Sequence, residues 1–207
     1  MRLLPREHGA SAIWFSSLLL AFGTLRQPPW VPRVVVFLAV SVLALIMTGR
    51  LTTRSRVIAR LERNPTLLPV LSSPLTLLVP LGQILMTGQL PIPILAVWLV
   101  FLTYCSLGVV YTRDSVRSVL TDAPLSWISF LLSAAVILAE VITLSAAQWL
   151  SITAIAVVLP LLIHRVIILS VTQRKGFSKI ERVRGVGFTQ AGNLIAATII
   201  LALVSRL

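Results

Sequence analysis

The chain has 207 residues, of which 57% are hydrophobic and only 12% are charged. Soluble domains average about 45–50% apolar and about 25% charged residues, so this composition argues for a protein that lies in a bilayer. The formal net charge is +12, from 18 Lys and Arg against 6 Asp and Glu. Because the basic residues stand in short clusters between apolar runs, they indicate membrane topology rather than a nucleic-acid-binding surface. The single cysteine, Cys105, excludes a disulfide framework.

Seven apolar runs follow one another along the chain, each near the length of about 20 residues with which a helix crosses a bilayer. The third run is the weakest, because its prolines interrupt helical hydrogen bonds, and it is either a kinked continuous helix or a broken one. The expected fold is all-α: a polytopic transmembrane helical bundle in which residues 1–207 form one integral membrane domain. The expected spans are residues 9–25, 31–49, 64–88, 94–111, 123–144, 148–171 and 186–204.

The basic residues alternate between the two sides of this arrangement. With seven spans, 14 of the 18 Lys and Arg residues fall on the side of the N-terminus and 3 on the opposite side, while Arg165 stands inside the sixth run. The positive-inside rule therefore predicts a cytoplasmic N-terminus and an external C-terminus. We expect a multi-pass protein of the cell (plasma) membrane, surrounded by the lipid bilayer, whose basic inner connections contact anionic lipids. No nucleic-acid partner is expected, and no protein partner is indicated.

Two ionisable residues, His164 and Arg165, lie within the sixth run, roughly 10 Å below its inner boundary. Ionisable side chains inside a span are costly and commonly functional. Arg165 either extends to the headgroups or faces the interior of the bundle. Since neighbouring residues of a helix point about 100° apart, we expect one of the pair to face the interior.

Further ionisable residues are predicted at the same inner side of the membrane. Arg113 and Arg117 are four residues apart and share a face if their segment is helical, which suits the binding of an anion. Asp122 is expected to begin the fifth span, where an acid favours the positive end of a helix. His8 and Asp122 are the candidate catalytic residues, which would handle a proton. The candidate ligand-binding residues are Arg6, Glu7, Arg113, Arg117, His164 and Arg165.

Short motifs carry a family resemblance. Pro5-Arg6-Glu7-His8-Gly9-Ala10 resembles the opening of the YwiC-like family of bacterial and archaeal membrane proteins. Arg117-Ser118-Val119-Leu120-Thr121-Asp122 is similar to that family's Arg-x-x-x-Asn-Asp segment, with Thr121 in place of Asn. The resemblance implies a small polytopic membrane protein in which Arg6, His8 and Asp122 match motif positions. It implies no particular activity.

Three functions stay open from the sequence. The first is a site, enzymatic or not, for an anionic amphipathic molecule of the lipid-phosphate type at the inner leaflet. The second is a small transporter or permease, and the third is a non-catalytic accessory or assembly subunit of a membrane complex. Two histidines and isolated acids do not predict a metal site, since zinc sites gather three or four ligands. No cofactor is indicated.

Overall fold

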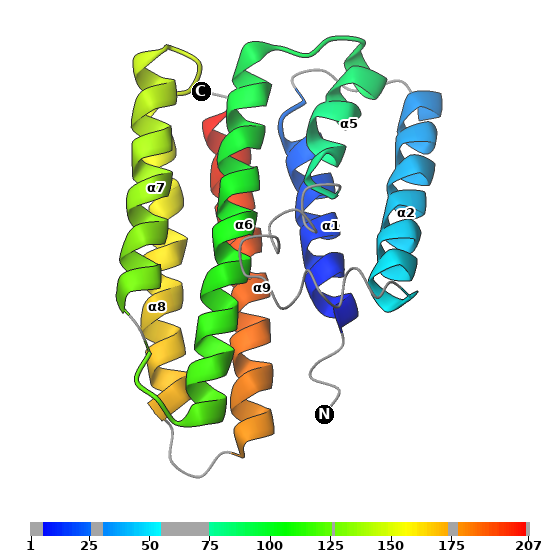
Figure 1. Ribbon diagram of the computed structural model, residues 1–207. Helices are drawn as coiled ribbons and strands as arrows, with labels where there is room; N and C mark the ends of the chain where they lie inside the picture. The colour runs from blue at the N-terminus through cyan, green and yellow to red at the C-terminus, as the bar shows by residue number, and fades with distance from the viewer. Residues whose placement is uncertain (1–5, 26–30, 55–74, 126, 174–177, 206–207) are drawn as a thin grey trace.

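The computed structural model describes residues 6–25, 31–54, 75–125, 127–173 and 178–205, without the side chains of 6–10, 45, 47–54 and 171–173. Every regular element in these residues is helical, as the sequence predicts (Figure 1). The first part of the third predicted span, with Pro65, Pro69 and Pro74, lies outside the described residues. The helices are α1 (Arg6–Gly23), α2 (Val31–Arg54), α5 (Leu78–Thr87), α6 (Ile92–Thr121), α7 (Trp127–Ala146), the 3-10 helix η1 (Ile152–Val157), α8 (Val158–Gln173) and α9 (Lys179–Val204).

The helices stand side by side in two groups (Figure 1). One group consists of α6, α7, α8 and α9, and the other of α1, α2 and α5, with α1 packed along α9 where the groups meet. Helices α6 and α8 run toward the end of the molecule that holds Asp122, and α7 and α9 run away from it. We call this the Asp122 end. Helix α1 begins on the same side of the molecule, whereas α9 finishes at the opposite end.

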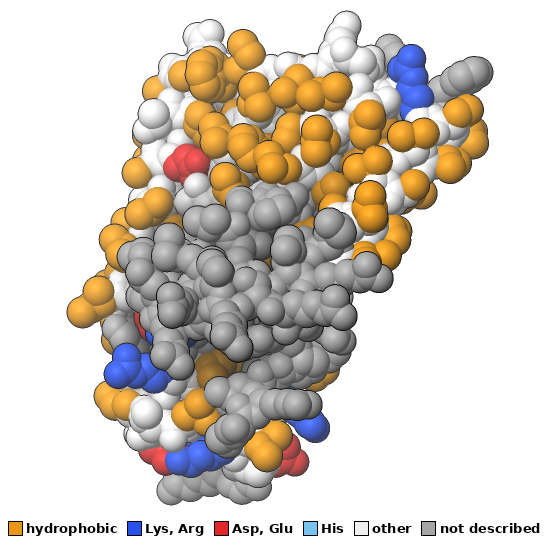
Figure 2. Space-filling model, turned by 45° about the vertical axis from the view of Figure 1, so that its right-hand side comes forward, with side chains coloured by type: hydrophobic (Ala, Val, Ile, Leu, Met, Phe, Trp, Pro, Cys, Tyr) orange, Lys and Arg blue, Asp and Glu red, His pale blue; other side chains and the backbone are white. Residues whose placement is uncertain are grey.

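Four helical stretches are long and apolar enough to cross a membrane: α6, α7, residues Ile152–Ser170 and α9. The first group has shorter apolar stretches, at Ser11–Gly23, Val31–Ala44 and Leu78–Thr87. Large apolar side chains also cover much of the outer surface, and the charged side chains visible in Figure 2 gather mainly toward its lower end. An apolar exterior of this extent suits contact with lipid chains. The number of spans beyond these four stays a prediction.

Helix α6 buries one face along its whole length, and the character of that face changes midway. Its first half presents apolar side chains, among them Val97 and Phe101. From Tyr104 onward the same face carries polar groups, including Tyr111 and Ser115, at the three- and four-residue spacing that keeps residues on one side of a helix. This face of α6 is therefore apolar far from the Asp122 end and gains polar groups toward it, where a small apolar cluster is also buried, formed by Val119, Leu125, Ile168, Val183 and Val186.

Helix α6 extends beyond the fourth predicted span. It continues to Thr121, because the buried positions recur at helical spacing beyond the apolar run. The prediction that Asp122 begins the next span is wrong. Asp122 closes α6 with a left-handed backbone (φ 53°), and its N–H donates to the carbonyl of Ser118. Asp is one of the few residues besides glycine that adopt this conformation readily.

The sixth predicted span is also divided. It starts as the 3-10 helix η1, whose N-terminal Ser151 side chain accepts a hydrogen bond from the Thr153 N–H, and continues as α8. Together the two elements still form one apolar stretch, Ile152–Ser170. His164 and Arg165 lie in its α-helical part.

Candidate functional site

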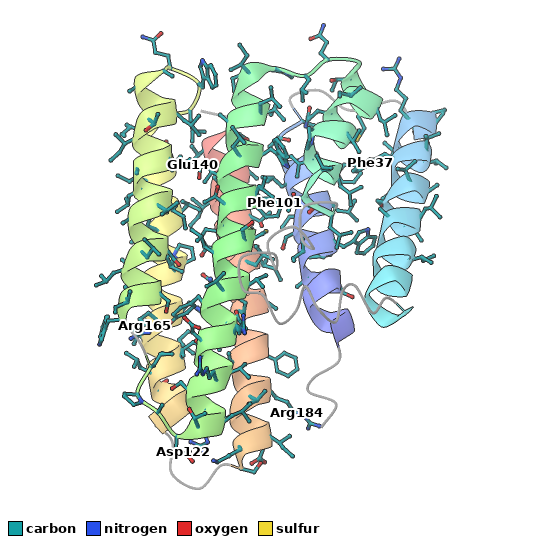
Figure 3. All side chains as sticks on the ribbon, viewed as in Figure 1. Phe37, Phe101, Asp122, Glu140, Arg165 and Arg184 are labelled. Carbon is teal, nitrogen blue, oxygen red and sulfur yellow. The ribbon has the colours of Figure 1, made fainter. Side chains whose placement is uncertain are left out.

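The structure buries both ionisable residues of α8. His164 is 1% exposed and Arg165 is 2% exposed, although the two are adjacent in sequence. The sequence predicts that one of the two faces the interior, and the structure shows that both do, because α8 is enclosed by neighbours on two adjoining sides. The alternative in which Arg165 extends to the headgroups is wrong. Figure 3 shows Arg165 among α6, α7 and α8, on the Asp122 side of the bundle's middle.

Arg165 is held by one polar group of α6 and one of the turn between α6 and α7. Its Nη1 donates to the hydroxyl of Tyr111 at 3.4 Å, and its Nη2 donates to the carbonyl of Leu125 at 3.3 Å. Tyr111 belongs to the buried face of α6, while Leu125 stands in the turn before α7. The guanidinium therefore connects α8 to α6 and to the turn before α7.

Aromatic rings form the walls around this guanidinium. Its carbon lies 4.2 Å from the centre of the Trp127 ring, 5.5 Å from that of Phe130 and 5.9 Å from that of Tyr111. A cation at these distances is attracted by the ring faces, most strongly by Trp. Phe130 and Tyr111 are buried, whereas Trp127 is 56% exposed. We call Arg165, His164, Tyr111, Trp127 and Phe130 the arginine cluster.

His164 lies beside Tyr111, with the two ring centres 5.4 Å apart in an edge-on arrangement. Both of its ring nitrogens are buried and have no hydrogen-bond partner among the described residues. A neutral imidazole has one donor and one acceptor nitrogen, and leaving both unsatisfied in the interior is unfavourable. The cluster therefore offers hydrogen-bonding capacity that the described chain does not use.

Asp122 takes part in a separate set of contacts at the end of the bundle. Its carboxylate accepts a short hydrogen bond from Lys179 and pairs with Arg182 at 3.6 Å. Lys179 also donates to the carbonyl of Leu120 at 3.1 Å. The hydrogen bond from Lys179 lowers the pKa of the Asp122 carboxyl below its usual value, and the charges of Lys179 and Arg182 act in the same direction. These contacts fasten the residue that caps the end of α6 to the first turn of α9.

The turn between α6 and α7 joins this ion pair to the arginine cluster. Asp122 holds one end of the turn, and the Leu125 carbonyl at its other end accepts from Arg165. Between them, the Ser118 hydroxyl donates to the carbonyl of Ala123. Polar groups from three helices thus hold one short segment in place.

The remaining predicted site residues are placed as follows. Arg113 and Arg117 do share a face of α6, but both are exposed, while the arginine cluster contacts the buried face of that helix. Arg6, Glu7 and His8 form the first turn of α1, and their side chains lie outside the described residues. Within the part of the chain that the structure describes, no three His, Cys, Asp or Glu side chains gather as metal ligands would.

Sequence reasoning missed three members of the cluster: Tyr111, Trp127 and Phe130. A signal for Tyr111 existed, since it stands seven residues after Tyr104 and so on the same face of α6. Trp127 and Phe130 offered none, because aromatic residues near a span boundary are typical of interfacial anchors. Their approach to Arg165 depends on how α7 packs beside α8.

Comparison of the chain with protein-family models, with curated proteins and with solved structures gives no match in any of the three. The resemblance to the YwiC-like family accordingly stays a prediction.

Proposed function

We propose that the chain is a multi-pass protein of the cell membrane, with seven spans and the Asp122 end on the cytoplasmic side. We further propose that the arginine cluster is a binding site for an anionic amphipathic molecule of the lipid-phosphate type. The observation that carries this proposal is the burial of Arg165 among Tyr111, Trp127 and Phe130 within an apolar helical stretch.

An arginine inside a span is unfavourable by about 2.5–3.5 kcal/mol on insertion scales, so such residues are retained chiefly where they function. A guanidinium can donate two parallel hydrogen bonds to a phosphate or carboxylate. His164 adds two unused ring nitrogens beside it. A phosphate held by Arg165 would also accept a hydrogen bond from the protonated ring nitrogen of His164 and so give that nitrogen a partner.

The position of the cluster also suits a lipid-type headgroup. Arg165 stands eight residues before the end of α8 at Gln173, or about 12 Å along the helix axis. Exposed Arg113 and Arg117 lie on the same half of the bundle and suit attraction of anionic molecules to this side. Because these two arginines do not line the cluster, we expect them to raise the local concentration of anionic molecules and not to contact the bound one.

Binding can be measured directly on the purified full-length chain in an uncharged detergent. We expect dodecyl phosphate to bind, and we expect Arg165→Met to weaken that binding about a hundredfold, since bidentate charged contacts contribute about 1.5–3 kcal/mol. Arg33→Met is the matched control: Arg33 bonds the Met86 carbonyl in the other helix group, so the variant loses the same charge elsewhere. Equal binding by the Arg165→Met variant and the wild type would refute the proposal.

A proton-transfer role for His8 and Asp122 belongs to the same proposal if the bound molecule is also converted. His8→Ala and Asp122→Asn would then stop conversion without reducing membrane insertion or dodecyl phosphate binding. Loss of binding in either variant would instead assign that residue to the structure of the site. Unchanged conversion in both would remove them from the reaction.

Transport is the second candidate function, and the ionisable His164 inside the sixth predicted span favours it, because such residues commonly mark substrate or proton pathways. The prolines of the third predicted span also favour it, since interrupted helices line substrate sites in many transporters. Uptake of dodecyl phosphate into vesicles containing the protein, compared with protein-free vesicles, tests this candidate. A stoichiometric protein partner, with no bound small molecule, would favour the accessory-subunit hypothesis instead.

A further inference from the structure

We infer that the Trp127 indole is the cover of the arginine cluster, and that the ligand reaches Arg165 by displacing this ring from the lipid side. The inference rests on the proposed function and narrows it. The ligand would be a molecule with an anionic head and an apolar chain that approaches within the bilayer, rather than a small anion from water.

The position of Trp127 sets it apart from the other walls of the cluster. Its ring lies 4.2 Å from the guanidinium carbon, closer than any other described ring, and yet the residue is 56% exposed. The Trp127 ring contacts the buried guanidinium on one side and is exposed on the other, so it separates Arg165 from the surroundings of the protein. Removing this ring would uncover Arg165.

The remaining sides of the cluster are closed by buried groups. Tyr111 is fully buried and bonded to Arg165, and Phe130 is 4% exposed. Toward the Asp122 end, the turn between α6 and α7 is fixed by the bond from Arg165 to Leu125 and by the Asp122 ion pairs. An approach from water at that end would require this turn to open.

Displacement of Trp127 needs less rearrangement. Trp127 is the first residue of α7, and its ring packs against the guanidinium and, in an edge-on arrangement, with the ring of Phe130, at 6.0 Å between centres. Rotation of one partly exposed side chain leaves the helices and the turn in place. A cation–π contact contributes about 0.5–2 kcal/mol, which a charge-assisted bond between Arg165 and a phosphate can replace.

The surface beyond Trp127 explains why the ligand should carry an apolar chain. The next outward-facing residues of α7 are Ile128, Leu131 and Leu132, which are 77%, 58% and 59% exposed. They continue from Trp127 along α7, away from the Asp122 end. An acyl chain whose headgroup replaced the indole would lie along this apolar strip.

The test compares two probes and three variants of the full-length protein in an uncharged detergent. The probes are dodecyl phosphate and inorganic phosphate. The variants are Trp127→Ala, the milder Trp127→Phe, and Trp149→Ala as a matched control. Trp149 is 44% exposed near the opposite end of the bundle, so its loss changes tryptophan content without touching the cluster.

The wild type should bind dodecyl phosphate and show no measurable affinity for inorganic phosphate. Apparent affinity equals the intrinsic affinity multiplied by the fraction of molecules whose cover is open. If about one tenth of the wild-type molecules are open, Trp127→Ala should bind dodecyl phosphate about tenfold more tightly. Trp127→Phe, with a smaller ring, should lie between the two, and Trp149→Ala should match the wild type.

Two sets of results would overturn the inference while leaving the proposed function standing. One is loss of binding in Arg165→Met with unchanged or weaker binding in both Trp127 variants. The other is equal affinity of the wild type for both phosphates. Failure of the wild type to bind either probe, or binding unaffected by Arg165→Met, would overturn the proposed function and this inference together.

Discussion

The two helix groups bury different kinds of polar group. In α1, α2, α5 and the residues next to them, the described buried polar side chains are all neutral: Ser16, Ser17, Thr24, Ser41, Thr76 and Gln83. In α6 to α9, the buried polar groups include His164 and Arg165. Both sets of helices are largely apolar, so their amino-acid composition alone does not distinguish them.

The partners of these groups show what the difference means. Gln83 donates to the Ala21 carbonyl at 3.1 Å and to the Thr24 hydroxyl at 2.6 Å, which ties α5 to α1. Its hydrogen bonds are directed within the helix group. The His164 ring nitrogens, in contrast, have no partner among the described residues. We interpret the first group as a support and the second as the part that holds the site.

The largest expected effect on stability comes from the contact between the groups. A Cβ atom added at Gly23 would stand 2.7 Å from the Cβ of Ala202, which is attached directly to the α9 backbone. Gly23→Ala should therefore push α1 away from α9 and destabilise the fold by about 1–3 kcal/mol. Thermal denaturation in detergent measures this change.

The control for Gly23→Ala is Gly187→Ala on α9, where an added Cβ meets nothing within 4 Å. It should leave stability unchanged or raise it by up to about 1 kcal/mol, since Ala favours helix over Gly. Equal loss in both variants would show that the close contact between α1 and α9 does not decide stability.

The next comparison sets one buried polar residue of each group against the other. Gln83→Met should lower stability by about 1 kcal/mol, because it removes hydrogen bonds between helices. Arg165→Met should leave the melting temperature unchanged or raise it, since replacing a buried charge by an apolar side chain is often neutral or favourable. A larger loss of stability in Arg165→Met than in Gln83→Met would mean that Arg165 is retained for structure.

A smaller effect is expected from a neutral pair within the second group. The Tyr104 hydroxyl donates to the Asn193 side-chain oxygen at 2.7 Å and so joins α6 to α9. Tyr104→Phe should cost about 0.6 kcal/mol, the average for such bonds between membrane helices. Dodecyl phosphate binding should be unchanged, and altered binding would extend the site beyond the arginine cluster.

The smallest effect concerns the exposed ion pair and depends on pH. The pKa of Asp122 is lower in the folded protein, because Lys179 and Arg182 favour its charged form. Its contribution to stability is therefore present above the usual Asp pKa of about 3.9 and is lost as the pH falls through the lowered value. Melting temperatures of the wild type and Asp122→Asn, measured from neutral pH downward, should differ slightly at first and converge in acid. A constant difference would exclude the ion pair as its cause.

Much of the helical order is predictable from the sequence, because apolar runs and their basic flanks are local features. The extent of α6 could not be predicted in this way, since hydropathy indicates which residues suit lipid and not which residues are helical. Residues 112–121 are polar, yet Ser115, Ser118 and Val119 continue the buried face at helical spacing. The expected start of a helix at Asp122 was wrong for a different reason: Asp is common both before a helix and in the left-handed residue after one.

The site was predictable only in part. The presence of His164 and Arg165 inside an apolar run marks them as candidates from the sequence alone. Their environment comes from tertiary packing, which brings Tyr111 from α6 and Trp127 from α7 to one guanidinium. Arg113 and Arg117 lie on the exposed face of α6, and no local pattern ties them to the buried face that Arg165 contacts.

The contacts of Arg165 have a consequence for how the protein is made. Tyr111, Leu125, Trp127 and Phe130 all precede Arg165 in the chain. During synthesis, the hairpin of α6 and α7 therefore enters the membrane before α8 arrives. A helix with an arginine inside its apolar stretch inserts poorly by itself, at a penalty of up to about 2.5–3.5 kcal/mol, the value for a central position. The hairpin provides the hydroxyl, the carbonyl and the rings that lower this penalty, so it serves as the insertion partner of the helix that follows it.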